Sequence, residues 1–277
     1  MAESATVIVQ LSDPHLVAPG RLLMGRVDTA ALLAQAVAAV GRLRPAPAAV
    51  LLTGDLVDAG RADEYAHLRT LLAPLRCPLL PMPGNHDATP ALRAAFADLP
   101  WLQPVAGDPA LAPYVLYARE IGGMRFVALD TVVAGAPHGA LCDARLAWLD
   151  ATLAAAPAQP TILAMHHPPF ATGIAHMDAM GLLHGAEALA ALLRRHPQVE
   201  RVACGHLHRT IVRRFGGTLA MTAPSTAHQI AFDLAADAPA TWRAEPPGFV
   251  VHAWHGGALV SHVVASGDHR PDRPFDD

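Results

Sequence analysis

Cysteine is scarce in this sequence, and its few cysteines lie far apart. Only three occur among 277 residues, Cys77, Cys142 and Cys204. A disulfide framework uses an even number of cysteines, and a thiolate zinc site uses closely spaced ones. The sequence therefore argues against both.

Long apolar runs are also absent, although 52% of the residues are hydrophobic. No window approaches the roughly 18 uncharged apolar residues of a membrane-spanning helix. The first residues lack the basic segment followed by an apolar segment that is typical of a signal peptide. We therefore expect a cytoplasmic protein with no membrane partner.

The sequence has no excess of positive charge. Its net charge is −4, and its 20 basic residues are spread over the whole length. This distribution gives no sign of a nucleic-acid-binding surface, so we expect no stable nucleic-acid partner. Histidine, by contrast, is abundant, with 16 residues. Because imidazole is the commonest metal ligand, the positions of these histidines need explaining.

Strands and helices alternate through the first two thirds of the chain, and hairpins follow. Apolar runs and helical spacing predict strands at 7–11, 49–52, 124–129, 161–165 and 202–204, and helices at 27–43, 62–75, 89–96, 143–153 and 186–195. This order indicates an α/β fold with two mixed sheets packed face to face and helices outside. We expect a single catalytic domain over residues 1–266 and a loosely ordered tail at 267–277.

Several finer expectations concern helix ends and the C-terminal third. Thr89 before Pro90 is predicted to cap one helix, and Asp143 to cap another. The segment 99–113 reads as irregular. Hairpins are predicted at 211–221 and 249–264, and exposed positions are expected for the histidines of the second hairpin, His252, His255 and His262.

Polar side chains follow four of the predicted strands and the short apolar segment that begins at Leu79. One such residue alone is more often structural than functional. Five clusters together indicate a site, because ligands of α/β folds bind beyond the carboxyl ends of the strands. Gly54, Gly84 and Gly205 allow close approach of the backbone. The polar residues are Asp13, His15, Asp55, Asn85, His86, His166, His206 and His208.

This set of side chains suits metal-assisted chemistry. Carboxylate, carboxamide and neutral imidazole are ligands for zinc, manganese, iron or cobalt. Seven or eight such ligands exceed the need of one ion, so two ions about 3.5–4 Å apart are expected, bridged by a carboxylate and a water. Two ions so placed would activate the water and hold both oxygens of a displacement at phosphorus. The residues therefore predict phosphoester hydrolysis.

The sequence resembles the calcineurin-like metallophosphoesterases. Their ordered blocks stand here as Asp13-Pro-His15, Gly54-Asp55, Gly84-Asn85-His86-Asp87, His166 in Met-His-His-Pro-Pro, and Gly205-His206-Leu207-His208. All five blocks occur in order between residues 13 and 208. The resemblance implies a four-layer αββα sandwich of two mixed β-sheets flanked by helices, the metallophosphatase fold.

The resemblance also implies a role for each residue of these blocks. Asp55 would bridge two ions, each divalent, or one trivalent and one divalent. His86 would face the leaving group, with Asp87 orienting it. The family pattern favours His166 over His167 as a ligand, which leaves His167 near the substrate. The two ligand sets would be Asp13, His15 and His208 for one metal, and Asn85, His166 and His206 for the other.

Within the family, the chain looks most like bacterial class III cyclic-nucleotide phosphodiesterases and glycerophosphodiesterases. The cues are the stretch from Gly60 to Tyr65, the His-His-Pro-Pro form and a late Pro-Ser-Thr-Ala-His-Gln segment that ends at Gln229. This likeness implies hydrolysis of a small phosphodiester by a hydroxide that bridges the metals. The likeness also implies that His228 contacts the substrate at the rim of the site. His176, in the loop after His166, is a further candidate for such a contact.

Other functions remain open at this point. The alternatives are a broad-specificity phosphomonoesterase or phosphonate ester hydrolase, a nuclease of the same fold, and a non-catalytic metal-binding scaffold. A homo-oligomer is a further expectation from the resemblance.

Overall fold

Two mixed β-sheets form the centre of the protein, which is described by a computed structural model over residues 5–267. The predicted tail from 268 onward lies outside these residues. The first sheet has the strand order β15-β14-β1-β2-β3, and the second has the order β10-β11-β9-β7-β5-β4. The first comprises β1 (Thr6–Leu11), β2 (Ala49–Thr53), β3 (Leu79–Met82), β14 (Gly248–His255) and β15 (Ala258–Ala265). The second comprises β4 (Leu116–Ile121), β5 (Met124–Leu129), β7 (Thr161–Met165), β9 (Val199–Cys204), β10 (Val212–Phe215) and β11 (Thr218–Thr222).

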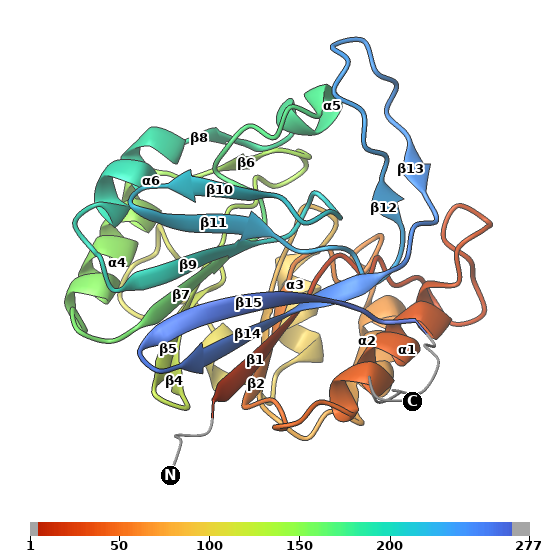
Figure 1. The fold of residues 1–277 in the computed structure, drawn as a ribbon, viewed down its shortest axis with the longest axis horizontal. Helices are drawn as coiled ribbons and strands as arrows, with labels where there is room; N and C mark the ends of the chain where they lie inside the picture. Colours follow the sequence, from red (N-terminus) through yellow and green to blue (C-terminus); the bar gives the residue numbers. More distant parts are fainter. Residues whose placement is uncertain (1–4, 268–277) are drawn as a thin grey trace, which may run out of the picture.

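Helices cover the outer faces of the two sheets, as Figure 1 shows, with α1 and α2 on one side and α4 and α6 on the other. The predicted four-layer sandwich of two mixed sheets flanked by helices is therefore confirmed. None of the helices within residues 5–267 has the length and apolarity of a membrane span. The helices are α1 (Thr29–Gly41), α2 (Ala62–Leu72), α3 (Thr89–Ala95), α4 (Asp143–Ala154), α5 (Ala175–Asp178) and α6 (Ala186–Leu193), with a 3-10 turn at Pro100–Leu102.

The directions of the strands determine where the predicted site lies. β1, β2 and β3 are parallel to one another, as are β5, β7, β9 and β11. β2 and β7 are buried along their whole length, which explains their largely apolar sequences. Parallel strands end on the same edge of their sheet, so the polar residues behind them come together.

The helices bury one apolar stripe each. In α1, Leu33, Val37 and Val40 are buried, and Asp28 caps the helix by accepting a hydrogen bond from the backbone of Ala31. Full burial of each such side chain contributes about 1.5–3 kcal/mol to stability. A single cluster of buried apolar residues joins these helices to both sheets.

Two capping predictions were wrong by one residue. Ala88 occupies the N-cap of α3, so Thr89 is already helical, and Cys142 occupies the N-cap of α4. Asp143 lies instead in the first turn, where its charge complements the helix dipole. The strand β4 was not predicted, and it lies at one edge of the second sheet.

Two small sheets complete the fold. β6 (Gly139–Ala140) pairs with β8 (Leu182–His184), and β12 (Gln229–Ile230) pairs with β13 (Trp242–Arg243). Both predicted hairpins form, as the antiparallel pairs β10–β11 and β14–β15.

His252 was expected to be exposed, and that expectation was wrong. It is fully buried on β14, where it donates from Nε2 to Gln10 Oε1 at 3.1 Å and accepts at Nδ1 from Ser261 at 2.8 Å. Gln10 in turn donates to Thr53 Oγ1 and to the Cys204 carbonyl. Burial, together with the charge of Arg201, lowers the pKa of His252 to about 3.

This buried imidazole makes stability depend on pH. The unfolded histidine has a pKa near 6.5, so its contribution is present above about pH 6.5 and is lost as the pH falls toward 3. Between pH 7.5 and pH 5, the loss from this group is about 2 kcal/mol. His252→Gln removes the titration and should therefore flatten the pH dependence of the unfolding free energy, measured by urea denaturation. If the unfolding free energy changed equally with pH in the parent protein and in His252→Gln, a neutral imidazole at His252 would be contradicted.

Candidate metal centre

Four of the five polar clusters line one cavity at the carboxyl ends of the strands, and the fifth, His166, is buried against Asp55 and Asn85. The volume of the cavity is about 410 Å³. Asp13, His15, Asp55, His166, His206 and His208 are all at most 5% exposed, which is unusual for polar residues without a ligand. The structure thus brings together residues that are up to 195 positions apart in the sequence. Those that line the cavity are His15, Asp55, Asn85, His86, His206, His208 and His228, with Asp58 and several apolar residues.

The backbone of the clusters has an unusual conformation. Six non-glycine residues within 5–267 have a positive φ, and five of them belong to the predicted site. Such left-handed residues cost of order 1–3 kcal/mol each and persist only where the surroundings hold them, often at functional sites. The five are Asp13, His15, Asp55, His206 and His208, with φ between 42° and 71°.

The first group of ligand atoms gathers Asp13, His15 and His208. His15 Nε2 lies 3.1 Å from His208 Nε2, and His208 Nε2 lies 3.6 Å from Asp13 Oδ1. Their ligand atoms all lie within 4.8 Å of one another. Asp55 Oδ2 is 3.5 Å from His15 Nε2, so this carboxylate borders the group.

The second group lies on the other side of Asp55. His166 Nε2 is 3.4 Å from Asp55 Oδ2 and 3.2 Å from Asn85 Oδ1. The His206 ring lies 5.1 Å from the His166 ring. The backbone N–H of His206 donates to the Asp13 carboxylate at 2.9 Å, which links the two groups.

Hydrogen bonds to carbonyl groups occupy Nδ1 of two of the imidazoles, so Nε2 carries the lone pair of the neutral ring. Nδ1 of His166 donates to the Thr53 carbonyl and Nδ1 of His208 to the His228 carbonyl. Their Nε2 lone pairs therefore face other acceptors across about 3 Å, and the buried Nε2 of His206 has no partner. Converging acceptors without donors, and rings oriented by carbonyls, are what a metal site requires. The residues present therefore fit metal ions.

The charges of the cluster support the same conclusion. Burial opposes ionisation of Asp55, but His166 and His15 outweigh it and hold the pKa of Asp55 well below its usual range. Burial likewise disfavours a charged His166, but Asp55 raises the pKa of His166 to about 9. Positive charge is thus favoured between these residues, and a bound cation would supply it.

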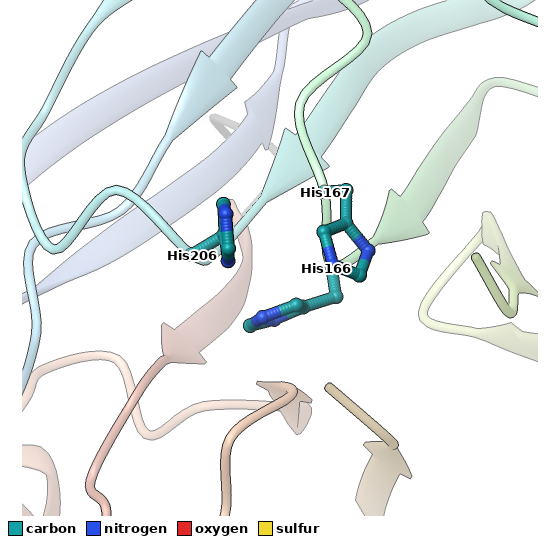
Figure 2. A group of neighbouring side chains, drawn as sticks. All are labelled: His166, His167 and His206. Atoms are coloured by element: carbon teal, nitrogen blue, oxygen red, sulfur yellow. The ribbon is translucent and has the colours of Figure 1, made fainter. Parts of the chain in front are cut away.

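His167 lies beside the second group but has no free lone pair. Its Nε2 donates to the Pro137 carbonyl at 3.1 Å, and its Nδ1 accepts from the Thr131 hydroxyl at 2.8 Å. Figure 2 shows its ring with those of His166 and His206, 4.9 and 4.7 Å away between ring centres. A ligand role therefore suits His166, which follows β7 directly, rather than His167.

His86 and Asp87 have different surroundings from those expected. Nδ1 of His86 donates to the Asp58 carbonyl at 2.8 Å, which leaves Nε2 free. Asp87 accepts instead from Gly84 N, Leu56 N and the Tyr65 hydroxyl. Asp58, not Asp87, thus orients the His86 imidazole. Asp87 fixes the turn that carries Asn85 and His86.

Sequence reasoning missed Asp58 as a site residue. Its carboxylate lies 3.5 Å from His15 Nδ1 and 3.7 Å from His86 Nδ1. The hydrogen bond with His15 lowers the pKa of Asp58. A carboxylate three residues after Asp55 was the available signal.

The two expected substrate contacts differ in position. His228 lines the cavity, with its ring centre 4.6 Å from that of His208 and 5.5 Å from that of His15. His176 is on α5 and is not among the residues that line the cavity. The loop before it is held by Asp178, which accepts from Thr172 and Gly173.

Comparison with known proteins assigns the family. Residues 6–210 match the family described as calcineurin-like phosphoesterase. The chain belongs to this family. The predicted class of enzyme, a metal-dependent phosphoesterase, is therefore confirmed, and the family implies divalent metal ions at the clustered histidines and aspartates.

Several relatives align over most of their length. A probable glycerophosphodiester phosphodiesterase of Arcobacter nitrofigilis is 33% identical over 270 residues, which cover 97% of this chain and 96% of that protein. A glycerophosphodiester phosphodiesterase of Enterobacter lignolyticus is 34% identical, with 92% and 90% covered. A 3',5'-cyclic adenosine monophosphate phosphodiesterase of Pseudomonas aeruginosa is 34% identical, with 83% and 79% covered.

Solved structures share the fold at low identity. A dimetal phosphatase from Danio rerio superimposes with a TM-score of 0.68 at 16% identity, with 96% of this chain and 98% of that chain covered. A purple acid phosphatase from yellow lupin gives a TM-score of 0.64, with 96% of this chain and 52% of that chain covered. The metallophosphatase fold predicted from the sequence is thereby confirmed.

Gly84 offers a test of how tightly the site is built. A Cβ at this position would overlap the side chain and backbone N of Asp55 and approach His166 Cε1 to 2.7 Å. Gly84→Ala should therefore strongly reduce the metal content of the purified protein, measured by elemental analysis, and lower the melting temperature. Gly41→Ala is the matched control, because a Cβ there meets nothing within 4 Å. Normal metal content in Gly84→Ala would contradict this close approach.

Proposed function

We propose that this protein hydrolyses small phosphodiesters at a centre of two metal ions. The observation that carries the proposal is the position of Asp55, whose Oδ2 lies 3.5 Å from His15 and 3.4 Å from His166. A carboxylate between two groups of ligand atoms suits a pair of ions rather than one. The relatives named above are phosphodiesterases, in agreement with the sequence-based expectation.

The residues assigned to the ions divide into two sets that share Asp55. Asp13, His15 and His208 would hold one ion, and Asn85, His166 and His206 the other. This mixture of nitrogen and oxygen donors accepts iron, manganese, zinc or cobalt. When bound, the ions supply positive charge to the phosphoryl oxygens and lower the pKa of water.

Two of the remaining polar residues, His86 and His228, are assigned to the substrate. His86 is fixed through Nδ1 by the Asp58 carbonyl and is 40% exposed, so its Nε2 is free to bring a proton to the departing alkoxide. His228, on the same cavity, is assigned a contact with the phosphodiester. Asp87 has no direct role in the reaction and maintains the turn.

The proposed substrates are 3',5'-cyclic nucleotides or glycerophosphodiesters. Both are small enough for a cavity of about 410 Å³, and both kinds of ester appear in the names of relatives. A cytoplasmic location, a homo-oligomeric state and the absence of a nucleic-acid partner stay predictions from the sequence.

Removal of a proposed ligand tests the metal assignment. Asn85→Ala should lower the metal content from about two ions per chain to about one, with a large loss of kcat on a 4-nitrophenyl phosphodiester. The control is His184→Ala, which changes an exposed histidine on β8 and should keep the metal content and the kcat of the parent protein. Two tightly bound ions and an unchanged kcat in Asn85→Ala would contradict the assignment of Asn85 as a metal ligand.

His86 should behave differently from the ligands. His86→Ala is expected to keep the full metal content but to reduce kcat by about 10²- to 10⁴-fold for an alkyl leaving group. The loss should be smaller for 4-nitrophenolate, which needs no proton to depart. Equal reductions of kcat for both leaving groups would contradict the role of His86 as a proton donor.

A further inference from the structure

Part of the cavity wall is apolar and rich in methionine. Met24, Met177 and Met180 line it together with Leu23 and Ile230. They come from separate segments, namely the loop before α1, the α5 region and β12. We call these five residues the methionine wall. Methionine is unbranched and polarisable, so it adapts to apolar groups of varied shape.

Met24 has an unexpected backbone conformation. Its φ is 52°, and within residues 5–267 it is the one non-glycine residue with positive φ outside the polar clusters. Reciprocal hydrogen bonds between Leu23 and Val27 close the turn around it, at 2.9 and 3.0 Å. The side chain is 50% exposed. Backbone strain clusters at active sites and ligand clamps, and here it occurs at a large apolar side chain that is half exposed beside the cavity.

The other part of the methionine wall is joined to the polar clusters. Met177 is buried with Ile174 and Leu207, and Met180 and Ile230 pack against them. Leu207 lies between His206 and His208 in the chain. An apolar group held by this part of the wall would therefore have a fixed position relative to the reacting phosphorus.

The charged side chains of the cavity are acidic. Asp55 and Asp58 line it, and no lysine or arginine is among the described residues that do so. Arg209, next to His208, donates instead to the Ile230 carbonyl and to Glu245. A second negative charge on the substrate would thus meet no cationic side chain, whereas an apolar ester group would meet the methionine wall.

We propose that the methionine wall binds an uncharged apolar ester group, so that the site prefers an aryl phosphodiester to one with a small alkyl group or with a second negative charge. The inference rests on the proposed phosphodiesterase function. Three substrates with the same 4-nitrophenolate leaving group test it on the metal-loaded protein. They are phenyl, methyl and 4-carboxyphenyl 4-nitrophenyl phosphate.

The phenyl ester should have a kcat/KM about tenfold or more above that of the other two. Met24→Ser should reduce the ratio of phenyl to methyl at least about threefold. Met24→Gly should reduce this ratio by a similar factor. Because glycine adopts a positive φ without strain, a reduced ratio in this variant reports the loss of the side chain rather than misfolding of the turn. Leu22→Ser is the matched control, because Leu22 is 48% exposed and does not line the cavity, so its ratio should equal that of the parent.

Binding gives a second measurement, independent of turnover. Diphenyl phosphate should inhibit at concentrations about tenfold below dimethyl phosphate, and Met24→Ser should narrow this difference. Two results would contradict binding of the ester group by the methionine wall but leave the proposed function intact. One is hydrolysis of all three substrates with no preference for the phenyl ester. The other is a phenyl-to-methyl ratio of kcat/KM in both Met24 variants that equals that of the parent protein. No hydrolysis of any of the three by the loaded protein would instead overturn the proposed function.

Discussion

Asp55 lies where the two sheets end together, and the rest of the site depends on this meeting. Its Oδ2 is within 3.5 Å of a histidine that follows β1 of the first sheet and of another that follows β7 of the second. Both sheets must therefore direct the carboxyl ends of their parallel strands to one cavity. The glycines beside Asp55 serve the same geometry, because a side chain at Gly54 or Gly84 would overlap His166 or Asp55.

Such a site is costly for the folded protein. Its proposed metal ligands include two buried carboxylates and four buried imidazoles, and five of its residues have left-handed backbone conformations. Buried charges need partners, and strained residues need surroundings that leave no alternative. The continuous apolar core that joins both sheets and the helices provides those surroundings. Stability in this protein is thus used to maintain a centre that would not form on its own.

The sequence predicts the layers and the clusters well because both depend on local patterns. Apolar runs mark the strands, and the blocks after them mark the cavity. Contacts between distant residues are not visible in such patterns. His252 is buried because Gln10, 242 residues away, pairs with it. The difference between His166 and His167 likewise depends on which carbonyl each ring meets. The roles of Asp58 and Asp87 follow from a turn geometry that the sequence alone does not specify.

Gln10 connects the two sheets by hydrogen bonds and so affects their alignment. Its amide nitrogen donates to Thr53 Oγ1 in the first sheet and to the Cys204 carbonyl in the second, while His252 donates to its amide oxygen. Hydrophobic attraction between the sheets is non-directional and would tolerate sliding of one layer over the other. Hydrogen bonds to both layers resist that shear. The spacing between the two groups of ligand atoms is therefore set in part by a neutral side chain that neither binds metal nor lines the cavity.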